Sequence, residues 1–129
     1  MYIFTLGTDV EKVVEGLRAQ YGEFALVMLY NDALQAESSW NLIVSAPWTD
    51  KMGVGEATGV IARALNQGLD LENQRAISRI TVLKMSDPFV RDMTKLYPAG
   101  ARARIPIAQL TAGEVTEGSG FILYSQKVA

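Results

Sequence analysis

Apolar residues recur along the chain at two spacings, one typical of helices and one typical of strands. Apolar residues three or four positions apart predict a helix over 8–21. Thr8 and Glu11 form a capping-box pattern at its start, and Gly22 ends it. The apolar segment 1–6 is predicted either as a short strand or as a segment packed over the core.

Two nearly continuous apolar runs predict strands that are covered on both faces. They are 24–30 (FALVMLY) and 40–46 (WNLIVSA). The connection between them is short and polar, which favours antiparallel pairing. Pro47 ends the second strand because it cannot donate to a ladder. The stretch 39–55 (SWNLIVSAPWTDKMGVG) is therefore predicted as the central strand of the fold and its exit turn.

Helical and strand patterns then alternate towards the middle of the chain. A helical stripe predicts a helix over 51–67, and the charged segment 70–75 is predicted as a loop. An apolar run predicts a third strand over 77–85, so the second strand, this helix and the third strand form a candidate right-handed βαβ unit. Asp87 before a proline predicts the N-cap of a helix over 87–97.

The C-terminal part predicts two further strands. Segment 101–110 alternates and contains Pro106, so it is predicted as an edge or irregular strand, and 121–126 (FILYSQ) as a final strand and second edge candidate. The predicted order is α-β-β-α-β-α-β-β. This order indicates a single globular domain over 1–129 of the α/β (or α+β) class, with a mixed sheet of about five strands and three helices.

Composition narrows the possible chemistry. The chain has 129 residues, of which 49% are hydrophobic, and it contains no cysteine and no histidine. Disulfide scaffolds, Cys/His zinc sites and thiol or imidazole catalysis are therefore excluded. We expect no cofactor and no bound metal. Without a membrane-length apolar run or a signal-peptide pattern, a cytoplasmic protein with no membrane contact is expected.

Charge is unevenly distributed along the chain. The balance is −6 over residues 1–74, +5 over 75–104 and −1 over the remainder. This asymmetry suits an anion-binding face or complementary packing between protomers, although ordinary solvated charge is the simpler interpretation. Nucleic-acid binding is unlikely, because the pI is about 5.1 and aromatic residues do not interleave with the basic ones.

Candidate ligand-binding residues gather where the second strand gives way to the next helix. Their glycines follow G-x-G-x-x-x-G, one residue longer than a dinucleotide fingerprint, so a flexible helix entrance is favoured over a nucleotide site. A packing or interface role of the tryptophan is favoured over ligand stacking. The set comprises Ser45, Trp48, Asp50, Gly53 and Gly55, with Arg79 and Arg104 as possible counter-charges, and no catalytic residue is assigned.

The function expected from these features is that of a small non-catalytic domain that forms a homodimer or binds a protein partner. The alternative is a small-anion-binding protein, or an enzyme that works without His or Cys, with a pocket over 45–56. No family resemblance is assigned. The run WNLIVSAPW has the character of a bacterial motif, with no activity attached to it.

Overall fold

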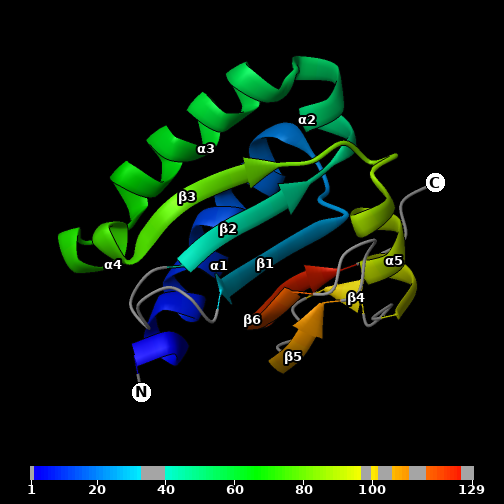
Figure 1. Cartoon of the computed structure of the whole chain (residues 1–129). Coiled ribbons are helices and arrows are strands. Elements are labelled where there is room, and N and C mark those ends of the chain that lie inside the picture. Colours follow the sequence, from blue (N-terminus) through cyan, green and yellow to red (C-terminus); the bar gives the residue numbers. More distant parts are fainter. Residues whose placement is uncertain (1, 33–39, 97–99, 102–105, 111–115, 126–129) are drawn as a thin grey trace.

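The structure of the protein is a computed structural model. It describes residues 2–32, 40–96, 100–101, 106–110 and 116–125, and the side chains of 6–30 and 40–95. The described strands form one mixed sheet in the order β3-β2-β1-β6-β4, with β5 also paired to β6 (Figure 1). Helices pack on both of its faces. The predicted mixed α/β class is therefore confirmed.

The described residues form five helices and six strands, so the predicted three helices and five strands are wrong in number. In chain order the elements are α1 (Tyr2–Tyr21), β1 (Leu26–Asp32), β2 (Trp40–Ser45), α2 (Pro47–Met52), α3 (Val54–Gly68), α4 (Leu71–Ala76), β3 (Ile77–Val82), α5 (Pro88–Leu96), β4 (Gly100–Ala101), β5 (Pro106–Leu110) and β6 (Thr116–Ser125).

The two predicted pairings of β2 are confirmed. β1 and β2 are antiparallel, with Val27 opposite Val44. β2 and β3 are parallel, with Leu42 opposite Ile80, and the chain passes through three helices between them. A short connection can join only antiparallel neighbours, whereas a parallel pair needs a long crossover, so connection length predicted both directions correctly.

The first helix is longer than predicted. It begins at Tyr2, so the prediction of a strand over 1–6 is wrong for the residues that the structure describes, and Thr8 lies inside the helix rather than at its N-cap. The alternative, a segment packed over the core, agrees with the burial of Leu6. Leu6 and Val10 are both fully buried. The apolar stripe that defines the helix thus extends one turn further towards the N-terminus than the capping-box pattern indicated.

The predicted helix over 51–67 is two helices. α2 starts at Pro47, which is favourable at a first helical position because it needs no N–H partner there. Gly53 separates α2 from α3 with φ of 97°, a conformation that side chains disfavour. The predicted loop over 70–75 is also wrong, because Asp70 caps a short helix there by accepting a hydrogen bond from the Asn73 amide at 2.8 Å.

The remaining boundaries differ in part from the prediction. β3 ends at Val82 instead of residue 85. α5 spans Pro88–Leu96, and the predicted end at residue 97 lies outside the described residues. Its predicted N-cap is confirmed by a 2.8 Å bond from the Phe89 amide to Asp87. The predicted strand 101–110 comprises β4 and β5, since residues 102–105 between them lie outside the described part. β6 starts at Thr116, where glycines hid the strand pattern, and it pairs with β1 on one side, so it is not an edge strand.

The sheet carries a large core on one face and a smaller one on the other. α1 and α3 cover the first face, where Val14, Ile61 and Val44 are buried together. α5 covers the second face, where Val90 and Met93 pack on Ile43. β3 lies at the outer side of the sheet, away from β6 and β5 (Figure 1).

Candidate functional site

The outer edge of β3 is the site that the described residues single out. β3 has β2 as its neighbour on one side, and no strand among the described residues lies on its other side. Its sequence, ISRITV, is rich in β-branched residues. It also carries one charged side chain, Arg79, and its register with β2 shifts beside Ser78, and both features often protect sheet edges, so only the part of β3 from Ile80 onward lacks them. An edge of this kind is able to accept another strand.

The direction of the β3 backbone groups follows from a single hydrogen bond. The Leu83 amide donates to the Val44 carbonyl at 2.9 Å, so the backbone of Leu83 faces β2. Because these groups alternate along a strand, Thr81 and Arg79 also face β2. The N–H and C=O groups of Ile80 and Val82 therefore point away from β2. Ile80 is partly exposed, whereas Val82 is 8% exposed.

A small depression of about 90 Å³, open to solvent, lies beside this edge on the side of α3 and α4. Its lining is mainly apolar, with two side-chain amides. The residues are Ala62, Leu65, Asn66, Leu69, Gln74, Ile77 and Ile80. Ile77 and Ile80 are only partly buried. The outer edge of β3 thus combines backbone groups that point away from β2 with an apolar surface.

Leu71 adds a further apolar residue to the same part of the molecule. It opens α4, the helix that leads directly into β3, and its side chain is 60% exposed. Gln74 fixes α4 against the end of α3 by donating to the Leu69 carbonyl at 2.8 Å. The surface next to the depression is therefore held in place.

Two of the predicted ligand-binding residues are buried. Ser45 is fully buried, and its hydroxyl has no hydrogen-bond partner among the described residues. Trp48 is 8% exposed and stacks on Tyr21, with ring centroids 4.9 Å apart, and it meets Phe24 edge-on at 5.5 Å. Trp48 therefore has the packing role that the sequence favoured, and it joins α2 to α1.

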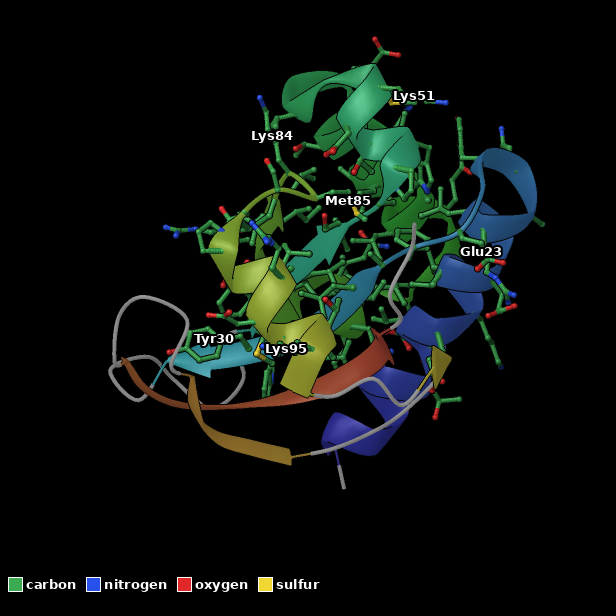
Figure 2. All side chains as sticks on the ribbon, turned by 90° about the vertical axis from the view of Figure 1, so that its right-hand side faces the viewer. Glu23, Tyr30, Lys51, Lys84, Met85 and Lys95 are labelled. Atoms are coloured by element: carbon green, nitrogen blue, oxygen red, sulfur yellow. The ribbon has the colours of Figure 1, made fainter. Side chains whose placement is uncertain are left out.

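The polar turn after Trp48 has structural partners. Both carboxylate oxygens of Asp50 accept from the Met85 amide at 3.2 Å, which joins α2 to the segment after β3. Gly53 forms the turn between α2 and α3, and Gly55 lies in the first turn of α3 with open space around it. Met85 and the neighbouring Lys84 lie at the same end of the molecule as Lys51 (Figure 2).

The structure does not place the candidate counter-charge Arg79 near the predicted ligand-binding segment 45–55. Arg79 is exposed and lies opposite Asn41, at the start of β2, whereas Ser45 lies at its end. A strand rises about 3.3 Å per residue, so these two positions are roughly 13 Å apart along the sheet. Arg104 lies outside the described residues. Ser45 and Arg79 therefore do not converge on one pocket.

The basic residues of 75–104 are also spread out. Arg75 lies before β3 and Lys84 after it, at opposite ends of the strand. Lys95 lies at the end of α5 away from Lys84 (Figure 2). Arg102 and Arg104 are outside the described part. The described basic residues thus do not gather into one anion-binding face.

The open edge of β3 was not among the residues that the sequence pattern selected. Ile80 and Val82 read as ordinary strand residues, and the C-terminal strands were the predicted edges. The sequence offers one hint, which is that no further strand pattern follows β3 closely. Whether a strand lies at the edge of a sheet depends on where later strands pair, and the pattern of residues does not show those pairings.

Comparisons with known proteins give no assignment. No family model matches the chain, and neither a curated protein nor a solved structure matches it. Within the described residues, no helix is long and apolar enough to cross a membrane, and no three Asp or Glu side chains are grouped as metal ligands would be. The function is therefore argued from the geometry alone.

Proposed function

We propose that the protein is a non-catalytic interaction domain that binds extended polypeptide at the outer edge of β3, either in a second copy of itself or in another protein. The observation that carries this proposal is the outward direction of the backbone groups of Ile80 and Val82, which follows from the Leu83–Val44 bond. Strand addition of this kind takes its affinity from main-chain hydrogen bonds and its specificity from adjacent side-chain pockets.

The depression beside β3 supplies the second requirement of strand addition, which is an adjacent pocket for side chains. An added strand would place alternate side chains over Ile77 and Ile80, where the lining is mainly apolar. The absence of histidine and cysteine supports a binding role over catalysis, because it removes the side chains that most often perform proton transfer and nucleophilic attack near neutral pH. The edge therefore supports recognition of a polypeptide better than it supports a reaction.

Light scattering after size-exclusion chromatography tests the proposal over a concentration series. We expect the mass of the wild type to rise above that of the monomer with concentration. Ile80→Lys should lower this association at least tenfold, because it places a charge at the apolar edge. Val54→Lys is the matched control: Val54 is 47% exposed at the start of α3, outside the depression, and its replacement should leave association unchanged.

A partner other than the chain itself is tested with short labelled peptides of alternating apolar and polar residues, followed by fluorescence anisotropy. Saturable binding that Ile80→Lys weakens and Val54→Lys does not would support the edge as the binding site. A wild type that stays monomeric at high concentration and binds none of these peptides would contradict the proposed function.

A further inference from the structure

We draw no further inference here: the strongest candidate, the small apolar depression between α3, α4 and the outer edge of β3, belongs to the site already described, and nothing among the described residues shows which polypeptide covers it.

Discussion

Two buried hydroxyl groups near the end of β2 differ in their hydrogen bonding. The hydroxyl of Thr49 accepts from the Ala46 amide at 3.1 Å and donates to the Ala46 carbonyl at 2.9 Å. The hydroxyl of Ser45 is equally buried and has no partner among the described residues. A bonded hydroxyl stabilises a fold, whereas an unbonded one costs desolvation free energy without return.

Removal of each hydroxyl should therefore have a different effect on the free energy of unfolding. Thr49→Val keeps the shape and leaves the buried Ala46 amide without its partner, so we expect a loss of about 1–3 kcal/mol. Ser45→Ala should change stability by less than about 0.5 kcal/mol, or raise it. Urea denaturation of both variants measures these values. A loss of about 2 kcal/mol for Ser45→Ala would show instead that its hydroxyl has a partner, such as an ordered water.

At this scale the sequence predicted which residues are buried better than it predicted their roles. A packing or interface role was favoured for Trp48, and it is 8% exposed in the core. The N-cap role of Asp87 followed from its place before Pro88. The cap at Asp70 was missed because no proline or clear apolar stripe follows it. A side chain that bonds to its own neighbours is predictable only where the local signal is strong.

Among the elements, α1 and α3 make a close contact at Gly68. A Cβ atom at Gly68 would lie 2.6 Å from Cγ2 of Val13, which is too short for any unstrained contact. Val13 is β-branched and has restricted rotamers, so it has little freedom to move aside. Glycine is therefore required at the end of α3 by the neighbouring helix.

Gly68→Ala should lower the free energy of unfolding by roughly 1 kcal/mol, since overpacking costs about 1–3 kcal/mol and helix propensity returns up to about 1 kcal/mol. In a Val13→Ala background the contact is absent, so the same substitution should raise stability. Thermal or urea unfolding of the four proteins in this double-mutant cycle checks the change of sign. Gly16→Ala, at an open position of α1, is the control and should be stabilising in both backgrounds.

The sequence predicted elements well where a long periodic stripe existed and poorly where two elements adjoin. α2 and α3 were predicted as one helix because Gly53, which separates them, also reads as a flexible entrance to a single helix. β6 was shortened because Gly118 and Gly120 lack strand propensity, although they pair with β1 through backbone groups alone. Backbone pairing does not depend on side-chain pattern, so such residues carry no signal in the sequence.

For the whole molecule, the sheet order decides where the exposed edge lies. The antiparallel and parallel partners of β2 followed from the lengths of its connections. The insertion of β6 beside β1 did not, because it joins segments far apart in the sequence. This insertion leaves β3 rather than a C-terminal strand with its outer side open among the described residues. The candidate interface is therefore a consequence of long-range pairing.

Pairing of two copies through β3 would couple folding to association. A dimer that unfolds to two separate chains becomes more stable as protein concentration rises. A tenfold rise corresponds to about 1.4 kcal/mol per dimer, which for two chains of this size shifts the Tm by about 2–3 °C. We expect this shift in scanning calorimetry of the wild type at concentrations where the dimer is populated.

The Tm of Ile80→Lys should be the same at every concentration, because the charge at the outer edge of β3 would keep the copies apart. Val54→Lys should retain the shift of the wild type, since Val54 lies outside the proposed interface. A Tm of the wild type that does not change over a hundredfold range would contradict coupled association. If Ile80→Lys shifted with concentration as the wild type does, association would be real but would use a surface other than the outer edge of β3.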